Sequence, residues 1–201
     1  TGMFLEDLQR FGFAAGLDFS PIALQYCREH NLSNLGRADV RYLPIRSSSI
    51  DLITAIDLVE HIEDDAGLLG EFFRVLRPGG YALISVPAHK YLWSPHDIAL
   101  HHYRRYEKGE FRRLVENAGL RPLRYSYSMA TAYLPALLFR SVKRRLTEIG
   151  PGSPATTDEF HIPGPLNAAL RTCVYAEAAL LRRTNLPFGL SLLCIAQKPS
   201  E

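Results

Sequence analysis

The hydrophobic positions of the chain follow two different spacings, and each spacing predicts a different kind of element. Short runs rich in apolar residues are typical of strands, whereas apolar positions three or four residues apart indicate helices. We expect helices at 4–11, 21–30, 66–76, 107–118, 129–146 and 166–183, and strands at 13–18, 35–43, 50–56, 81–86, 120–127 and 190–196. The 50–56 strand is apolar enough to be buried on both faces. Strands that alternate with helices of about ten residues predict βαβ units and a parallel sheet.

Capping and turn residues set the predicted boundaries. Ser20 is a typical N-cap before Pro21, and Gly119 is a typical stop after the 107–118 helix. We predict a sharp turn at 77–80, which reads Arg-Pro-Gly-Gly, and long connections at 88–106 and 150–165.

Composition indicates one globular domain in a reducing compartment. The 201 residues are 47% apolar with a net charge of +2, and basic runs with interleaved aromatic residues are absent, which argues against a nucleic-acid partner. The three cysteines are far apart among apolar neighbours, so we expect reduced thiols and a cytoplasmic protein. No run of 18 apolar residues is present, and therefore no membrane span is expected. The chain begins with Thr1, and we interpret it as a fragment or a processed product.

Asp18 stands at the end of the first predicted strand, in the run Gly-Leu-Asp-Phe-Ser-Pro at 16–21. Ligands of open α/β sheets bind at the carboxyl ends of strands, where a carboxylate can accept hydrogen bonds from both hydroxyls of a ribose. The alternative is a turn aspartate that caps the next helix.

Histidines are the candidate proton acceptors, and five are considered. For any one of them the alternative is a solvated or structural histidine. Four polar residues in the 88–106 connection also raise the question of a metal, but their spacing is not that of a zinc site, so we predict none. The five histidines are His61, His89, His96, His101 and His102, and the four residues are His96, Asp97, His101 and His102.

The run Tyr-Arg-Arg-Tyr at 103–106 combines arginine with aromatic residues on a long loop. Such a loop suits an anionic acceptor, with Tyr103 and Arg105 as candidate site residues, or it is a basic surface turn. Tyr91 and Trp93 either wall an acceptor pocket or anchor the loop.

The 129–146 helix has an apolar first half and a basic second half. It either lies on an anionic membrane surface and presents a lipid-linked acceptor, or it packs over the sheet with a solvated basic end.

Several blocks together resemble the class I S-adenosylmethionine-dependent methyltransferases of the small-molecule type. The resemblance covers roughly residues 1–127, and the last strand fits the antiparallel final strand of that fold. The family pattern implies that the first strand and most of the glycine-rich loop are missing from this chain. The blocks are Thr1-Gly2, 16–20, 38–40, 51–61 and the turn at 76–80.

The resemblance also implies roles for individual residues. Gly2 would let the backbone approach the methionine part of S-adenosylmethionine, and Asp18 would hold the ribose with Phe19 beside the adenine. Asp39 would contact the adenine amino group, and Val40 would cover the ring. The methionine side would be lined by Asp57 and Leu58, with His61 near the transferred methyl group.

The expected fold is α/β, doubly wound and Rossmann-like, with a mainly parallel sheet and an antiparallel last strand. We expect one domain with a cofactor-binding core at 1–127, a helical insertion or cap at 128–188 and the last strand at 189–198. The expected activity is methyl transfer to a small-molecule or lipid-linked acceptor, with no oligomeric state indicated. The alternatives are a non-catalytic binding or scaffold domain and a nicotinamide-dependent dehydrogenase.

Overall fold

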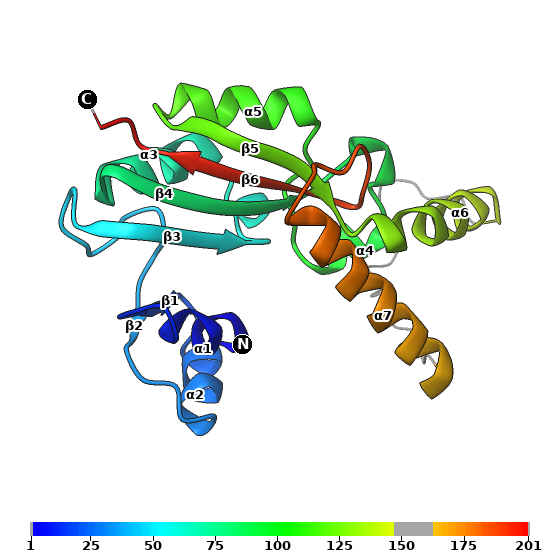
Figure 1. Ribbon diagram of the computed structural model, residues 1–201, viewed down its shortest axis with the longest axis horizontal. Helices are drawn as coiled ribbons and strands as arrows, with labels where there is room; N and C mark the ends of the chain where they lie inside the picture. Colours follow the sequence, from blue (N-terminus) through cyan, green and yellow to red (C-terminus); the bar gives the residue numbers. More distant parts are fainter. Residues whose placement is uncertain (1, 147–162, 201) are drawn as a thin grey trace.

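The computed structural model describes residues 2–146 and 163–200. Its strands form two sheets, one of two strands and one of four (Figure 1). The elements are α1 (Met3–Gln9), β1 (Gly16–Asp18), α2 (Pro21–Glu29), β2 (Leu35–Arg37), β3 (Ile50–Ile56), η1 (Val59–His61), α3 (Asp65–Val75), β4 (Leu76–Pro87), η2 (Lys90–Leu92), α4 (Pro95–Ala99), α5 (Lys108–Asn117), β5 (Arg121–Ser128), α6 (Ala130–Leu146), α7 (Gly164–Leu181) and β6 (Ser191–Gln197).

The larger sheet has the strand order β3-β4-β6-β5. β3 and β4 are parallel, whereas β6 runs antiparallel to both β4 and β5. The predicted antiparallel last strand is therefore confirmed. α3 packs on β4, α5 packs on β5, and the two helices touch each other beside the sheet (Figure 1). Alternating helices and strands of this kind confirm the predicted Rossmann-like α/β class.

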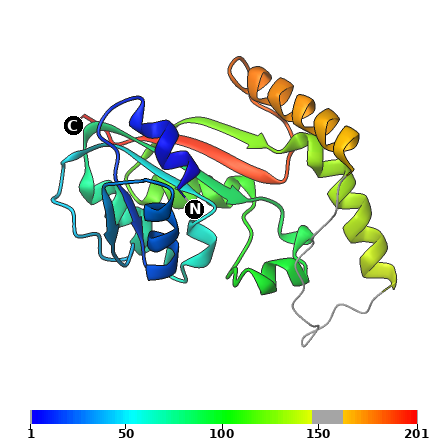
Figure 2. The same cartoon turned by 90° about the horizontal axis from the view of Figure 1, so that it is seen from below.

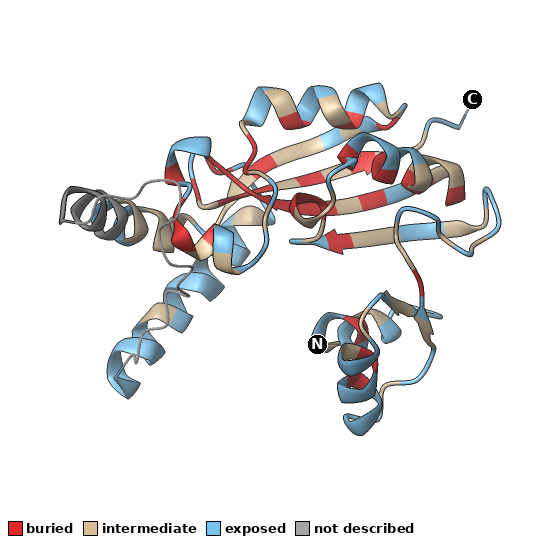
Figure 3. Cartoon of the chain, turned by 180° about the vertical axis from the view of Figure 1, so that it is seen from behind, coloured by how far each residue is buried: buried red, intermediate tan, exposed pale blue. Residues whose placement is uncertain are grey.

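The main core lies between this sheet and the two helices, where the buried positions gather in Figure 3. α3 contributes Leu68, Leu69 and Phe72 to this core, and all three are buried. Asp64 caps this helix by accepting a hydrogen bond from the Gly67 amide at 2.9 Å. Local capping and apolar spacing thus place α3 correctly from sequence alone.

The smaller sheet pairs β1 and β2 in parallel, with α1 and α2 beside it (Figure 1). Ser20 caps α2 as predicted, since the amide of Ala23 donates to its Oγ at 3.3 Å. The predicted strand at 13–18 is wrong in length, because only Gly16–Asp18 pairs with β2, and Phe13 is 88% exposed. The apolar side chains of α2 divide, since Leu24 is buried whereas Ile22 and Tyr26 are exposed.

The prediction that β3 is buried on both faces is wrong. β3 is an edge strand that pairs with β4 alone, and its Leu52 and Ile56 side chains are exposed. An edge strand lacks a neighbour on one side, so its side chains remain more accessible than those of a central strand.

Two predicted irregular stretches are more regular than expected. β4 begins at Leu76 and includes the predicted turn, with Gly79 in the left-handed region at φ +77°. Gly80 is needed there because a side chain would approach the carbonyl oxygens of Arg77 and Ile50 within about 3 Å. The 88–106 connection contains η2 and α4, and a capping box between Ser94 and Asp97 begins α4. The predicted 150–165 connection falls largely on residues outside the described ranges.

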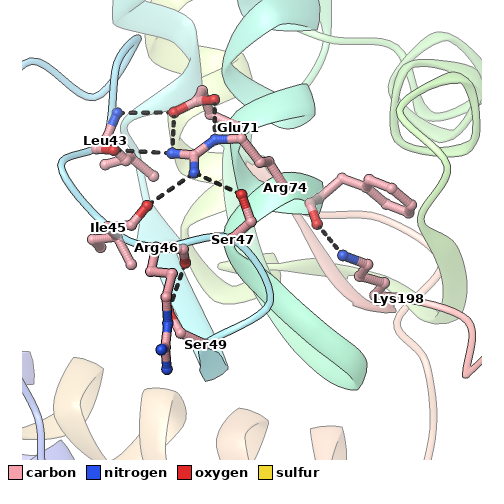
Figure 4. Close-up of polar contacts among 9 residues, drawn as sticks. Leu43, Ile45, Arg46, Ser47, Ser49, Glu71, Arg74 and Lys198 are labelled. Atoms are coloured by element: carbon pink, nitrogen blue, oxygen red, sulfur yellow. Dashed lines mark hydrogen bonds and ion pairs between the residues drawn. The ribbon is translucent and has the colours of Figure 1, made fainter.

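Arg74 ties the segment between β2 and β3 to α3 (Figure 4). Its guanidinium pairs with Glu71 on the same helix and donates to the carbonyl oxygens of Leu43 and Ile45. It also donates to Ser47 Oγ at 3.1 Å. One planar five-donor group thereby fixes the path of the chain from the smaller sheet to the larger one.

α6 and α7 extend beyond the end of the larger sheet (Figure 2). They meet where the amide and the hydroxyl of Thr131 both donate to Glu177 Oε2 at 3.0 Å. α7 has no buried residue. The predicted basic end of the 129–146 helix consists of side chains that lie outside the described residues. Within the described ranges, none of the helices combines the length and apolarity that crossing a membrane requires.

Candidate functional site

The chain segments that follow β1, β2 and β3 surround one cavity of about 750 Å³. It lies beyond the carboxyl ends of these parallel strands, where open α/β sheets bind their ligands. Most of the sequence-predicted cofactor residues are brought together here from three separate parts of the chain. The lining residues are Leu17, Asp18, Phe19, Asp39, Val40, Arg41, Leu58, His61, Ile62, Glu63, Asp64 and Tyr103.

Asp18 is the last residue of β1, and its carboxylate lines the cavity. The Ser20 amide donates to its Oδ1 at 2.8 Å, so Asp18 also supports the turn into α2. The capping role considered from the sequence is therefore present. It involves one carboxylate oxygen, and Oδ2 has no hydrogen bond in the described part of the chain.

Asp39 follows β2 and is held by Arg41, which also lines the cavity. The Arg41 guanidinium donates to both carboxylate oxygens, with the shortest contact 2.6 Å between Nη2 and Oδ2. Hydrogen bonds from the Arg41 side chain, then from its backbone, lower the pKa of Asp39, so this group stays ionised near neutral pH. A ligand that uses Asp39 must share it with Arg41.

Phe19 and Val40 give the cavity apolar surface. Phe19 is 65% exposed, and the Arg37 guanidinium carbon lies 5.3 Å from the centre of its ring. Val40 is half-buried and packs against the main core. Apolar side chains in the wall of a cavity suit a flat aromatic ligand group.

Asp57 follows β3 with φ +49°, a left-handed conformation that is uncommon outside glycine. Its amide donates to the Ser85 carbonyl at 3.0 Å, and Ser85 Oγ donates to its Oδ1 at 3.2 Å. Asp57 itself is outside the cavity lining, whereas the next residue, Leu58, is part of it. The strand end thus turns sharply so that Leu58 faces the cavity.

His61 lies at the end of η1 and lines the cavity. Its ring meets that of His102 edge-on, with the ring centres 4.7 Å apart. Burial, followed by the nearby His102, lowers the pKa of His61 below 6.5.

The structure places Tyr103 in the lining but Arg105 and His89 elsewhere. Arg105 is buried and donates to Asp97 Oδ1 at 2.7 Å and to the Ala88 carbonyl at 3.1 Å. His89 is buried and stacks on Tyr127, with the ring centres 5.2 Å apart. Both residues hold the polypeptide around the site rather than facing the cavity.

Gly2 also lies outside the lining, at the start of α1 with φ +85°. A side chain at this position would collide with Leu32 and approach Cys27 at the end of α2. The close packing of α1 against α2 is therefore sufficient to require glycine here.

Sequence reasoning missed several residues of the site. Arg41 lines the cavity. The sequence held one indication of its role, because a basic residue two positions after Asp39 is close enough to form an ion pair with that carboxylate. Glu60 gave no local signal at all, because its burial depends on the distant 97–105 segment that packs over it. Leu17, Ile62, Glu63 and Asp64 complete the missed lining residues.

Comparison with known proteins shows that part of the chain is similar to methyltransferases. Residues 1–84 match the family described as a methyltransferase domain. Over 112 residues the chain is 34% identical to a probable S-adenosylmethionine-dependent methyltransferase of Mycolicibacterium smegmatis, covering 52% of this chain and 42% of that protein. Over 71 residues it is 37% identical to phthiotriol/phenolphthiotriol dimycocerosates methyltransferase 1 of Mycobacterium ulcerans, covering 34% of this chain and 26% of that protein. The alignments thus span less than half the length of these relatives.

The solved structure of an S-adenosylmethionine-dependent methyltransferase from Archaeoglobus fulgidus has the same fold. Its TM-score is 0.62 at 17% sequence identity, covering 98% of this chain and 81% of that one. By its matched residues 1–84 this chain is similar to the methyltransferase domain family, and it shares the fold of S-adenosylmethionine-dependent methyltransferases.

Proposed function

We propose that the protein transfers a methyl group from S-adenosylmethionine to a small-molecule or lipid-linked acceptor. The observation that carries the proposal is the cavity itself. It combines the carboxylates of Asp18 and Asp39 with the apolar side chains of Phe19 and Val40 at the ends of parallel strands.

The lining residues fit this cofactor. The carboxylate of Asp18 suits the two ribose hydroxyls, and Phe19 and Val40 suit the faces of a purine. Asp18, Asp39, Glu63 and Asp64 put four carboxyl groups on the wall against the single guanidinium of Arg41, a balance that favours a cation. When bound, S-adenosylmethionine would supply a methyl group on a positively charged sulfur, with a neutral thioether as the leaving group.

The protein's own contribution is alignment, because the cofactor brings its leaving group with it. Leu58 and Ile62 give the wall near His61 an apolar surface that excludes water. We place the acceptor beside His61 and Tyr103, where an imidazole nitrogen can accept a proton from an acceptor hydroxyl. This assigns His61 and Tyr103 to the acceptor side of the cavity, and Arg105 and His89 to positioning roles.

The acceptor proposal extends to lipid-linked compounds and to contact with a membrane surface. Leu134 and Leu138 of α6 are exposed, as are Val174 and Tyr175 of α7. One relative is named for the methylation of phthiotriol and phenolphthiotriol dimycocerosates, which supports a lipid-linked acceptor. Residues 128–188 would then act as a cap that presents such an acceptor to the 1–127 core.

Calorimetric titration tests the cofactor proposal. S-adenosylhomocysteine is titrated into the wild-type protein, into Asp18→Ala and into Asp51→Ala. Asp51 is the matched control, since its exposed carboxylate pairs with Arg77 outside the cavity lining. We expect wild type and the control to bind alike, and Asp18→Ala to bind roughly 10-fold to 100-fold more weakly through the loss of charged hydrogen bonds.

Three outcomes would contradict the proposal. Equal affinity for wild type and Asp18→Ala removes Asp18 from the site. Binding of NADH in place of S-adenosylhomocysteine supports a dehydrogenase. Binding of neither compound supports a non-catalytic scaffold.

A further inference from the structure

Glu60 is a buried carboxylate without a partner. Its side chain is completely inaccessible, and neither Oε1 nor Oε2 has a hydrogen-bond partner outside its own residue in the described part of the chain. Buried polar groups are almost always paired, because a bare carboxylate in a protein interior is strongly destabilising. The structure therefore points to a missing positive partner at this position.

Two histidines stand beside this carboxylate. The carboxylate of Glu60 and the ring nitrogens of His61 and His102 supply three ligand atoms that all lie within 4.8 Å of one another. The cluster joins η1 to the segment after α4, and the amide of Tyr103 donates to the Glu60 carbonyl at 2.8 Å to hold the two together. Two imidazoles and one carboxylate form a ligand set that favours divalent transition metals.

A second carboxylate orients one of the histidines. Asp97 is fully buried, and its Oδ1 lies 3.0 Å from His102 Nδ1. The same oxygen accepts from Arg105, and the amide of Ser94 donates to Oδ2 at 2.9 Å. This arrangement fixes the His102 ring and leaves Nε2 directed away from Asp97. Metal-bound histidines are held by carboxylates in this way.

We propose that Glu60, His61 and His102 bind one divalent transition-metal ion, with Asp97 as the group that orients His102. Two ligand atoms bound at about 2.1 Å lie at most about 4.2 Å apart, so at most a small side-chain movement would bring atoms that lie within 4.8 Å of one another to bonding distance. The charges favour a cation, because the two carboxylates of Asp57 and Asp97 outweigh the single guanidinium of Arg105 among the described groups that act on Glu60. His61 also lines the cavity, so the ion would lie in its wall. With the ion bound, His61 would be a metal ligand, and the proton-accepting role proposed for it above would belong to the metal-free protein.

Metal binding is measured directly, without any methyl-transfer assay. The chelator-treated protein is titrated with Zn²⁺ by calorimetry and with Co²⁺ by visible absorption, which reports the coordination sphere. We expect one ion per chain and a rise in Tm on Zn²⁺ addition, because a ligand that binds only the folded state stabilises it. This result is independent of whether S-adenosylhomocysteine binds, so failure of one proposal leaves the other intact.

Three substitutions test the ligand assignment. Glu60→Gln and His102→Gln are expected to weaken Zn²⁺ binding at least 100-fold, and Asp97→Asn to weaken it 10-fold to 100-fold. His30→Gln is the control, since this histidine is exposed on α2 and contacts the Tyr26 carbonyl. Glu60→Gln removes an unpaired buried carboxyl group while keeping the side-chain volume, so metal-free Glu60→Gln should melt no lower than metal-free wild type.

Two results would overturn the proposal. One is the absence of stoichiometric Zn²⁺ and Co²⁺ binding by the wild-type protein. The other is unchanged Zn²⁺ affinity and an unchanged Co²⁺ spectrum in folded Glu60→Gln and His102→Gln.

Discussion

Arg105 and Asp97 form a buried ion pair, with Nε of the guanidinium 2.7 Å from Oδ1 of the carboxylate. The Arg105 side chain is 6% exposed and that of Asp97 is fully buried. Burial alone would raise the pKa of Asp97, but Arg105, His102 and Ser94 together lower it, so the carboxylate stays ionised. The pair closes the 97–105 loop on itself, and Arg105 also ties this loop to the end of β4 by donating to the Ala88 carbonyl at 3.1 Å.

Removing the arginine should therefore destabilise the protein strongly. We expect Arg105→Ala to lower the free energy of unfolding by about 3–5 kcal/mol, because it leaves a buried charge without a partner. Urea unfolding measures the loss. Arg104→Ala is the matched control, since the neighbouring guanidinium is about one-third exposed and pairs with Asp65. Its loss should be about 1–2 kcal/mol, and equal losses would contradict a buried pair at Arg105.

The Arg74 contacts lead to a second prediction. Arg74→Lys keeps the charge but cannot reach Glu71, two carbonyl oxygens and Ser47 at once. We expect it to cost about 1–3 kcal/mol and to speed amide hydrogen exchange at residues 43–49. Arg77→Lys is the control, because Arg77 is exposed and pairs with Asp51 at the surface. Unchanged exchange at 43–49 would show that other contacts hold this segment.

The turn after β3 gives a third prediction. Asp57 is in the left-handed region, where a β-carbon costs about 1–2 kcal/mol. Asp57→Ala and Asp57→Gly both lose the hydrogen bond from Ser85, but only glycine also relieves the strain. Thermal unfolding should therefore show the glycine variant to be more stable than the alanine variant by about 1 kcal/mol. A more stable alanine variant would mean that the backbone is not strained here.

Much of the fold follows from local sequence signals. Asp64, Gly119 and the apolar spacing of α3 and α5 predict those helices almost to the residue, because caps and helical periodicity act within a few positions. The exposure of β3 could not be predicted in this way. A run of apolar residues does not reveal how many neighbouring strands it has.

The residues of the candidate site also fall into two groups: those that local sequence signals predict and those that only the tertiary fold brings together. Asp18, Asp39 and Leu58 follow strands directly, so the strand pattern was enough to bring them to one cavity. Glu60 is far in sequence from Asp97 and His102, and it meets them only because the 94–105 segment folds back over η1. The contact of Glu60 with this segment is a tertiary contact, and the spacing of residues along the sequence does not predict it.

The buried imidazole of His89 should make stability depend on pH. Burial lowers its pKa in the folded protein below 6.5. At lower pH the unfolded chain binds more protons at this residue, so stability falls as the pH drops below about 6.5 until the folded pKa is passed. Unfolding in urea between pH 7.5 and 5 should show a smaller decrease for His89→Asn than for wild type. Asparagine tolerates the left-handed backbone found at this position. Identical pH dependence would exclude His89 as a contributor.

Contact between α6 and a membrane gives the last prediction. Leu134 and Leu138 are four residues apart, which places them on one side of the helix, and both side chains are exposed. Burying a leucine in an apolar phase is worth about 1.5–3 kcal/mol, so Leu134→Glu with Leu138→Glu should weaken binding at least about 10-fold. Flotation with vesicles of phosphatidylcholine and phosphatidylglycerol measures this. Phe11→Glu is the control, because Phe11 is 88% exposed on the segment after α1. Equal weakening by both changes would exclude α6 as the contact surface, and no binding by wild type would exclude these membranes as a partner.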